Sequence, residues 1–327
     1  MDYGPIIDGG LAFASVLILM ALNIPIGISM LVVGFIGFAY ISGFNPAVLV
    51  LGFAPYEAVS KYSLSVMPLF VLMGNLANSA NLSRNLYDAA YAVVGHYKGG
   101  LAMSTVGACA GFGMICGSSI ATAATMSQMA GPEMKRHGYS DALISGSIAS
   151  GGTLGIIIPP SVILVIYAYL TEQSVQELFF AALIPGLIAV ILYMIAIRVY
   201  LIIYPSHGGH GNKMPLKERI AAITKVFPIF LIFAIIMGGL YLGFFTATES
   251  AAVGVVLVLL FILARGQLTL TLLKEALWTT IKTVGSLYLI VIGASIFNYL
   301  ITVTQLPFAV VDFINHLELT PLGIILV

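Results

Sequence analysis

Charged side chains are scarce in this sequence. Only 8% of its 327 residues are Asp, Glu, Lys or Arg, whereas 60% are hydrophobic. A soluble domain carries about 25% charged residues, so this composition excludes an ordinary soluble protein and indicates an integral membrane protein with many spanning helices. The formal net charge is zero, so nothing indicates a nucleic acid partner, and the lipid membrane is the partner that composition implies.

Cysteine and catalytic motifs are also scarce. The only two cysteines, Cys109 and Cys116, lie seven residues apart on one predicted helix. That is too far for a disulfide, and we interpret them as small packing residues. The sequence has no phosphate-binding loop, no nucleophile paired with a base, and no histidine spacing typical of a metal site. It therefore predicts neither an enzyme nor an ATP-driven pump, and no cofactor.

Apolar stretches of about 20 residues predict the spanning helices. A tight helical pair is expected at 11–22 and 25–41, followed by a loop at 43–62 with room for a surface helix. Further spans are expected at 63–80, 178–204, 226–244, 249–264 and 279–300, with a polar loop at 205–225 and interfacial segments at 82–96, 268–274 and 306–316.

Basic residues orient these pieces, because cytoplasmic loops of membrane proteins are enriched in Lys and Arg. Lys98 and Lys135 both fall on the predicted cytoplasmic side. The segment between them must leave the membrane where it entered, and each half is short for a full span. We therefore predict a re-entrant helical hairpin at 100–134 with its tip near Gly117. The alternative is two ordinary short helices with a tight turn on the far side.

An internal repeat is visible at an offset of about 220 residues. Gly34 matches Gly254, Gly74 matches Gly293, and each copy has an amphipathic segment after its span. The charge pattern makes the copies inverted, which is the architecture of secondary transporters. We predict a first repeat at 1–170, a connecting helix and cytoplasmic loop at 171–225, and an incomplete second repeat at 226–327.

In this register a second hairpin should begin near Gly323. The sequence therefore predicts that roughly 100 further residues, including half of a symmetric site, belong to the repeat but not to this chain.

The first interruption of the apolar pattern is Gly117-Ser118-Ser119, followed by a run of Ala and Thr at 121–125. Irregular backbone is tolerated at membrane depth only where it is buried in protein or lines a cavity. Hydroxyls and freed carbonyls offer oxygen ligands for Na⁺, and a helix starting at Ser119 favours a carboxylate at its N-terminus. The alternative is helix packing, which explains residues 121–125 well but not the tip.

The second interruption runs from Gly151 to Ser161. Pro159 and Pro160 remove two backbone donors, and Gly151 and Gly152 allow unusual conformations. We predict an unwound segment within a broken helix at 141–170; a simple proline kink is the alternative. A third candidate, Glu249, is better explained as part of a capping box with Thr246.

Three stretches carry a family resemblance: GSSIATAA at 117–124, PEMKRHGY at 132–139 and GGTLGIIIPPS at 151–161. With shorter matches at 67–70, 184–186 and 245–250, they resemble the large membrane subunit of tripartite ATP-independent periplasmic (TRAP) transporters. The resemblance covers essentially the whole chain, except that the family's carboxy-terminal hairpin has no counterpart in it.

The resemblance implies a multi-pass permease of the bacterial or archaeal inner membrane. Such a permease is a Na⁺ symporter for small organic anions, such as C4-dicarboxylates, sialic acid or keto and sugar acids. A periplasmic binding protein delivers the anion, and a small four-helix membrane subunit completes the assembly. The implied fold is an all-α inverted-repeat transporter of the elevator type, with a re-entrant hairpin and a discontinuous helix, and with its second hairpin missing here.

Carried over residue by residue, the resemblance places the hairpin tip at Ser118 and Ser119 and the broken helix at 151–160. The expected substrate-binding residues are Ser119, Thr122, Thr153 and Pro160. The expected Na⁺-binding residues are Gly117, Ser118, Gly151, Gly152 and Pro159.

Two alternatives remain open. One is a carrier of the same ion transporter superfamily that needs no binding protein and moves citrate, arsenite or protons. The other is a membrane scaffold or receptor that transports nothing.

Overall fold

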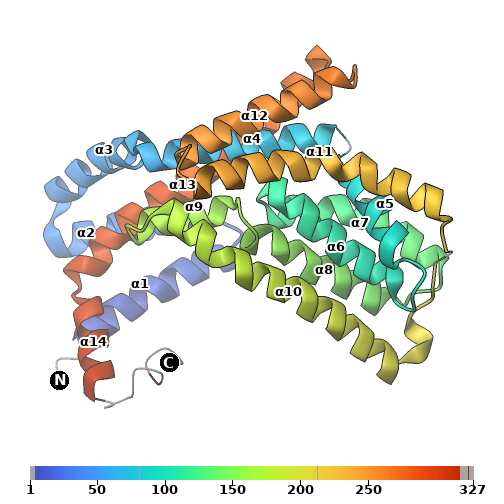
Figure 1. The fold of residues 1–327 in the computed structure, drawn as a ribbon. Coiled ribbons are helices and arrows are strands. Elements are labelled where there is room, and N and C mark those ends of the chain that lie inside the picture. Colours follow the sequence, from blue (N-terminus) through green and yellow to red (C-terminus); the bar gives the residue numbers. More distant parts are fainter. Residues whose placement is uncertain (1–3, 81, 212, 317–322, 324–327) are drawn as a thin grey trace. The chain divides into compact units, whose positions relative to one another are not determined.

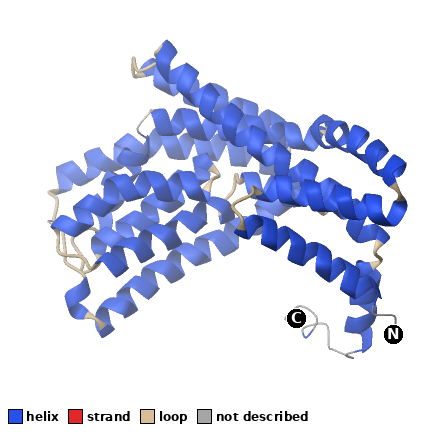
Figure 2. Cartoon of the chain, turned by 180° about the vertical axis from the view of Figure 1, so that it is seen from behind, coloured by secondary structure: helices blue, strands red, loops and turns tan. Residues whose placement is uncertain are grey.

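The computed structural model describes residues 4–80, 82–211, 213–316 and 323, and in these residues all regular structure is helical (Figures 1 and 2). Within them, four helices are long and apolar enough to cross a membrane, or up to six if each bent pair counts as one span. The chain is an all-helical, multi-pass membrane protein. The helices are α1 (Gly4–Ala21), α2 (Ile26–Ser42), α3 (Phe44–Ser60), α4 (Val66–Ser79), α5 (Leu82–Val94), α6 (Gly100–Cys116), α7 (Ser119–Arg136), α8 (Asp141–Ile157), α9 (Val162–Leu170), α10 (Val175–Ile203), α11 (Leu216–Tyr241), α12 (Ala247–Ala264), α13 (Leu270–Val303) and α14 (Leu306–His316).

Several predicted elements are confirmed. The segment expected as a hairpin is the helix pair α6 and α7, and the segment expected as a broken helix is α8 and α9, bent by 50°. The two amphipathic segments are α5 and α14. The capping box at the start of α12 is present, with the Thr246 amide donating to Glu249 over 2.8 Å and the Glu249 amide donating to the Thr246 hydroxyl over 3.3 Å.

The segment 43–62, predicted as a loop with room for a helix, is almost entirely helix α3, and Pro46 lies in its first turn, where no amide donor is needed. Two other predictions of irregular or separate segments were wrong. Helix α11 already begins at Leu216, inside the predicted polar loop. The expected interfacial segment 268–274 is continuous with the following span in the 34-residue helix α13, since no glycine or proline interrupts the sequence between 270 and 284. The hairpin expected near Gly323 lies outside the described residues.

The chain divides into two compact units. Unit 1 comprises Met1–Lys61 and Val284–Val327, and unit 2 comprises Tyr62–Thr283. The boundary falls inside α13. These units follow spatial contacts rather than the predicted repeats, so the repeat boundaries stay a prediction.

In unit 1, glycines let α2 lie directly on the end of α13. A Cβ atom on Gly34 would lie 2.8 Å from the Cα of Phe297, and one on Gly27 would lie 2.7 Å from the carbonyl oxygen of Leu289. The core around this contact is apolar and includes Phe38 and Ile296. Small residues therefore bring two helix backbones together here, beside a core of apolar side chains.

In unit 2, α12 lies alongside α4 (Figure 1). A Cβ atom on Gly254 of α12 would collide with the Sδ atom of Met73 on α4. Gly34 and Gly254 are the matched glycines of the predicted repeat, and each faces the span that precedes an amphipathic helix.

Several segments of unit 2 meet around Tyr139. Its hydroxyl donates to the carbonyl of Gly209 over 2.9 Å and accepts from the amide of Leu101 over 3.2 Å. Burial raises the pKa of this hydroxyl to about 12, so it stays protonated and able to donate. The start of α6, the end of α7 and the α10–α11 connection are thereby held together. We call this region, with Lys98, Lys135, Arg136 and Arg198, the basic end of unit 2.

Candidate functional site: a hairpin tip against a helix break

The first helix break is a two-residue turn. Helix α6 ends at Cys116, and Gly117 follows in the left-handed conformation, with φ of 60° and its amide bonded to the Gly113 carbonyl over 2.9 Å. Glycine takes this conformation without the steric cost that other residues pay. Ser118 is extended and caps α7, accepting from the Ala121 amide over 3.4 Å. The serine and glycine of the predicted tip therefore end one helix and begin the next.

Thr122 supports this turn from inside the protein. Its side chain is fully buried, and its hydroxyl donates to the Ser118 carbonyl over 2.7 Å. The Thr122 amide donates to the same oxygen over 3.1 Å. The conformation of the tip is thus fixed by a side chain one turn into α7.

The second helix break is shorter than predicted. Helix α8 ends at Ile157, and only residues 158–161, all buried, separate it from α9. Because Pro159 and Pro160 have no N–H group, they cannot donate to the carbonyls of Gly155 and Ile156, four residues earlier in each case. These two carbonyls are therefore left without helical donors. Ser161 closes the break by capping α9 through the Leu164 amide over 3.4 Å.

Gly151 and Gly152 were predicted in the unwound segment, but they lie inside α8. A Cβ atom on Gly151 would lie 2.9 Å from the Sγ of Cys109 on α6, and one on Gly152 would lie 2.8 Å from the Cβ of Ala123 on α7. These glycines are needed for close packing of three helices rather than for unwinding.

The two breaks lie against each other. A Cβ atom on Gly117 would lie 2.9 Å from the carbonyl oxygen of Pro160. One on Gly155 would lie 3.0 Å from the carbonyl oxygen of Ser118 and 2.9 Å from the Thr122 hydroxyl. Backbone carbonyls and hydroxyls from both breaks are therefore concentrated at one place inside unit 2.

Most of the predicted site residues belong to this contact. Gly117, Ser118, Ser119, Thr122, Pro159 and Pro160 lie at the tip or the break.

Thr153 does not belong to this contact. Its hydroxyl donates to the Ser150 carbonyl over 2.6 Å and lies 3.2 Å from the Tyr193 hydroxyl of α10. Thr153 therefore faces α10 rather than the tip.

Two asparagines of α4 are not among the predicted site residues. Asn78 lies 3.4 Å from the Thr125 hydroxyl of α7, and Asn75 donates to the Thr280 hydroxyl of α13 over 2.9 Å. Both lie in an apolar helix three residues apart. Polar side chains in such helices commonly bond across to a neighbouring helix, so this spacing was a usable signal.

The protein atoms at the tip and the break that could coordinate an ion or bind a substrate are mostly oxygens. Within the described part of the chain, no group of three or more His, Cys, Asp or Glu side chains is arranged to hold a metal ion. The ligands that the tip and the break can offer are backbone carbonyls and hydroxyls, with the N-terminus of α7 directed at the same place. Such a set suits a Na⁺ ion or a carboxylate better than a transition metal.

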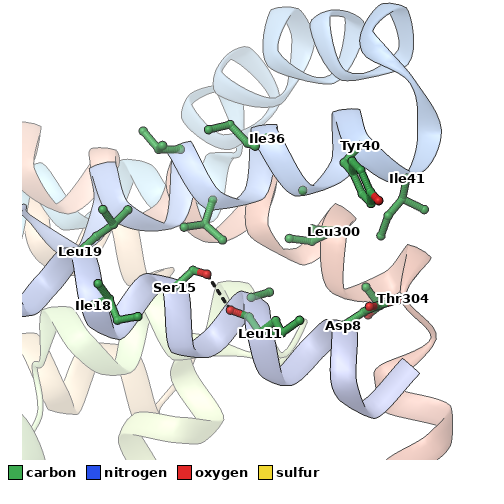
Figure 3. A pocket seen from close by; sticks show the side chains of 14 residues that line it. Asp8, Leu11, Ser15, Ile18, Leu19, Ile36, Tyr40, Ile41, Leu300 and Thr304 are labelled. Atoms are coloured by element: carbon green, nitrogen blue, oxygen red, sulfur yellow. Dashed lines mark hydrogen bonds between the residues drawn. The ribbon is translucent and has the colours of Figure 1, made fainter. Parts of the chain in front are cut away.

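A cavity of about 560 Å³ in unit 1 has a different character (Figure 3). Its walls are largely apolar side chains of α1 and α2, among them Leu11, Ile18 and Ile36, and Leu300 of α13 closes one side. Asp8 is the only charged residue among the described residues that line it, and the Ser15 hydroxyl donates to the Leu11 carbonyl over 2.7 Å. This cavity offers few donors to an anion, so the contact of the two breaks is the better candidate.

Comparison with known families decides the assignment. The profile of the family described as "Tripartite ATP-independent periplasmic transporter, DctM component" matches residues 13–327. The chain belongs to the DctM family. It is a large permease subunit of TRAP transporters, a family of transport proteins rather than enzymes.

Curated relatives of the DctM family agree. The C4-dicarboxylate TRAP transporter large permease protein of Pseudomonas aeruginosa is 35% identical over 298 residues, which cover 87% of this chain and 69% of the relative. The sialic acid TRAP transporter large permease protein of Vibrio cholerae is 31% identical over 94% of this chain and 71% of its own length. The ectoine TRAP transporter large permease protein of Halomonas elongata is 29% identical over 96% of this chain and 73% of its own length.

Proposed function

We propose that the protein carries out Na⁺-coupled uptake of a small organic anion across the bacterial inner membrane. The anion would be delivered by a periplasmic binding protein, and a small four-helix membrane subunit would complete the transporter. Membership of the DctM family supports solute uptake through a TRAP system. The contact of the hairpin tip with the helix break supports the binding of a coupling Na⁺ ion and of the anion at that place.

That contact is the observation on which the proposal rests. Carbonyls that have lost their helical donors coordinate Na⁺ in transporters with broken helices, and helix N-termini point at the carboxylate of the substrate. We assign Na⁺ to the backbone oxygens around Gly117, Ser118 and Pro159. We assign the carboxylate to the start of α7, where Ser119 and Thr122 lie opposite Pro160. Gly151 and Gly152 support the site by packing, and Thr153 does so through Tyr193.

Helix lengths support a re-entrant hairpin. Helices α6 and α7 have 17 and 18 residues, which corresponds to about 26 Å at 1.5 Å per residue. The hydrocarbon core is about 30 Å thick. Because both arms begin or end at the basic end, the tip would stop short of the opposite surface. Helix α8 starts at the same end with 17 residues, so its break would reach the same depth.

We further propose an elevator mechanism in which the hairpin and the broken helix move together. The contacts of α6, α7 and α8 through Gly113, Gly152 and Gly155 would let them move as one body. Substrate and Na⁺ would then cross with this body rather than diffuse through a channel.

Uptake into proteoliposomes tests the proposal. The full-length protein would be reconstituted with the small subunit and supplied with the binding protein and labelled anions, with and without an inward Na⁺ gradient. We expect uptake only when both the binding protein and the gradient are present. Uptake without the binding protein would favour the alternative carrier of the same superfamily, and uptake without the gradient would exclude Na⁺ coupling.

A pair of variants locates the site. Ser119→Leu should abolish uptake by blocking the start of α7 while the binding protein still docks. Ser127→Leu is the matched control, since Ser127 is exposed on the same helix and its hydroxyl bonds only to the Ala124 carbonyl. Equal uptake by the two variants would show that the tip is not the site.

A further inference from the structure

A groove lies on the surface of unit 2, where α10 runs alongside α6 (Figure 1). Its volume is about 460 Å³. Its lining consists mostly of apolar side chains, among them Met103 of α6 and Ile191, Met194 and Ile195 of α10, and it includes Arg198 at the basic end. We call it the α6–α10 groove.

The α6–α10 groove opens onto lipid. Helix α10 is one of the apolar spans, and only 11% of its most apolar stretch is buried in the described part of the protein. Ile191 and Ile195, which line the groove, are each more than half exposed. Exposed apolar surface on a spanning helix faces the acyl chains of the membrane. An apolar tail can therefore enter the groove from the side.

Two cationic residues meet at the basic end of this groove. Lys98 precedes Gly99, which has φ of 81° and lies so close to α10 that a Cβ atom would collide with Leu201. Arg198 of α10 donates to the Lys98 carbonyl over 3.3 Å. The turn before α6 is thereby attached to α10, and it brings together two cations that are 100 residues apart in sequence.

Both cations are accessible, and neither is neutralised within the described part of the chain. The ion pairs that the described residues form do not include Lys98 or Arg198. Both side chains are exposed. The bond of Arg198 to a neutral carbonyl uses one of the five N–H donors of a guanidinium group, so most of its donors stay available to an anion.

The helix ends at this place also favour an anion. Helix α5 ends at Val94, and its last carbonyls would repel a negative charge, but Arg219 donates to the carbonyls of Ala92 and Val93 over 2.7 and 3.1 Å. Helix α6 begins at Gly100, and a helix N-terminus carries partial positive charge. The field at the basic end of the groove is therefore positive.

The occupant must match an apolar wall and a cationic end together. A soluble anion would leave the apolar side chains of the groove uncovered, and a lipid without net charge would leave Lys98 and Arg198 uncompensated. Tyr97 lines the groove at the same end and is 54% exposed. Tyrosines with one apolar and one polar side are enriched at the level of the lipid headgroups.

We propose that the α6–α10 groove binds an anionic phospholipid. Its phosphate pairs with Arg198 and Lys98, and one acyl chain lies against Met103, Met194 and Ile195. Basic sites between spanning helices on the cytoplasmic side bind anionic headgroups in this way, and the sequence predicts that the basic end is cytoplasmic. The lipid joins α10 to the first arm of the hairpin. The proposal requires only that the chain is a membrane protein, so it can fail while the proposed transport function stands.

Native mass spectrometry of the full chain in detergent tests binding without any transport. The probes are dioleoyl phosphatidylglycerol and dioleoyl phosphatidylcholine, which have the same tails, and glycerol 3-phosphate, which has no tail. We expect the anionic lipid to bind at least about fivefold more tightly than phosphatidylcholine, which corresponds to about 1 kcal/mol. Equal affinity for the two lipids overturns the proposal. Displacement of phosphatidylglycerol by an equal concentration of glycerol 3-phosphate assigns the cations to a soluble anion and also overturns it.

Arg198→Gln separates a headgroup site from general attraction to a basic surface. It should weaken binding of phosphatidylglycerol about fivefold and leave binding of phosphatidylcholine unchanged. Arg265→Gln is the control, because it removes the same charge from an exposed arginine that lies over the ring of Phe261 instead of beside the groove. Equal losses in the two variants overturn the proposal. Arg198→Lys keeps the charge and should retain most of the affinity; a loss as large as that of Arg198→Gln would make Arg198 a structural residue only.

A second pair of variants tests the position of the acyl chain. Ile191→Trp narrows the groove and should weaken phosphatidylglycerol binding about fivefold. Leu192→Trp is the control, since Leu192 is exposed on the same helix but does not line the groove. Equal affinities in these two variants contradict the assignment of the tail. A dimer of the chain that excludes phosphatidylglycerol would show that a second copy covers the groove, and that result also overturns the proposal.

Discussion

Glycine brings helices together in both units, but with different consequences. In unit 1, Gly34 lets α2 approach α13 in the middle of two uninterrupted helices, where its neighbours are the backbone of Ile296 and Phe297 within an intact helix, and apolar side chains surround the contact. In unit 2, Gly117 and Gly155 bring together a helix end and a helix break, and the neighbouring groups are carbonyls and hydroxyls. Close approach by itself is only packing. Close approach at a helix end and a helix break also gathers backbone oxygens in one place, which is why we propose the site there.

The largest expected effect comes from placing a side chain at the tip. Gly117→Ala adds a Cβ in a left-handed conformation and 2.9 Å from the Pro160 carbonyl. We expect uptake to fall about 100-fold, since a displacement of about 1 Å at a reacting or binding centre can cost that much. Proteoliposome uptake, normalised to folded protein, measures it.

Gly266→Ala is the control for this variant. Gly266 has φ of 66° but no atom within 4 Å of an added Cβ. It shares the conformational cost of about 1–2 kcal/mol without the contact. If both variants lose uptake equally, the tip has no special role. That result would contradict the proposed difference between the two units.

A smaller effect is expected from removing one hydroxyl at the tip. Thr122→Val keeps the shape of the side chain but loses the bond to the Ser118 carbonyl. We expect the Na⁺ concentration for half-maximal uptake to rise about tenfold, which corresponds to about 1.4 kcal/mol. Titrating uptake against Na⁺ measures this shift.

Thr105→Val is the matched control for Thr122→Val. Thr105 is equally buried, and its hydroxyl donates to the Leu101 carbonyl over 2.9 Å on α6. Both variants should lose about 0.5–1.5 kcal/mol of stability. Only the variant at the tip should change the Na⁺ dependence, and a shift in both would point to a general loosening of the helices.

A third test compares the matched glycines of the predicted repeat. Gly34→Ala should lower the free energy of unfolding by about 1–3 kcal/mol, because its Cβ meets the backbone of Phe297 and a helix must shift. Gly254→Ala should cost less, since it meets the flexible side chain of Met73. Thermal unfolding in detergent ranks the two.

Uptake per folded molecule should stay near normal in both of these variants. Gly285→Ala, in a helix with no atom near the added Cβ, should be neutral or stabilising by up to about 1 kcal/mol. A larger loss of stability for Gly254→Ala than for Gly34→Ala would contradict the geometry.

The smallest effect concerns the helix starts of the same two elements. Helix α12 begins with the Thr246–Glu249 capping box, whereas α2 begins after Pro25, which makes no side-chain cap. Thr246→Ala should therefore cost about 1 kcal/mol of stability without changing the Na⁺ dependence. A changed Na⁺ dependence would place Glu249 in the transport site after all.

The sequence predicted the positions of the helix breaks more accurately than the conformation of the chain at each break. Gly117 and the pair Pro159 and Pro160 have strong local preferences, so the places where helices end could be read directly. Gly151 and Gly152 were misread because a glycine that permits unwinding and a glycine that permits close packing look the same in sequence. Only the neighbours, Cys109 and Ala123, distinguish the two uses.

Residues that act across long sequence distances could not be found in the same way. The bond of Asn75 to Thr280 joins positions 205 residues apart. The continuity of α13 was missed because the expected interfacial segment 268–274 was separated from the span expected at 279–300, although Lys274 and Glu275 both favour helix.

The bonds of Tyr139 have a mechanical consequence for the hairpin. One phenol fixes the first residues of α6 and the residue that follows α7 to the same connection. The turn at Gly117 and Ser118 joins the same two helices at their other ends. Two rods tied together at both ends form a closed frame, so the arms of the hairpin cannot splay at either end, and the pair can be displaced only as one piece.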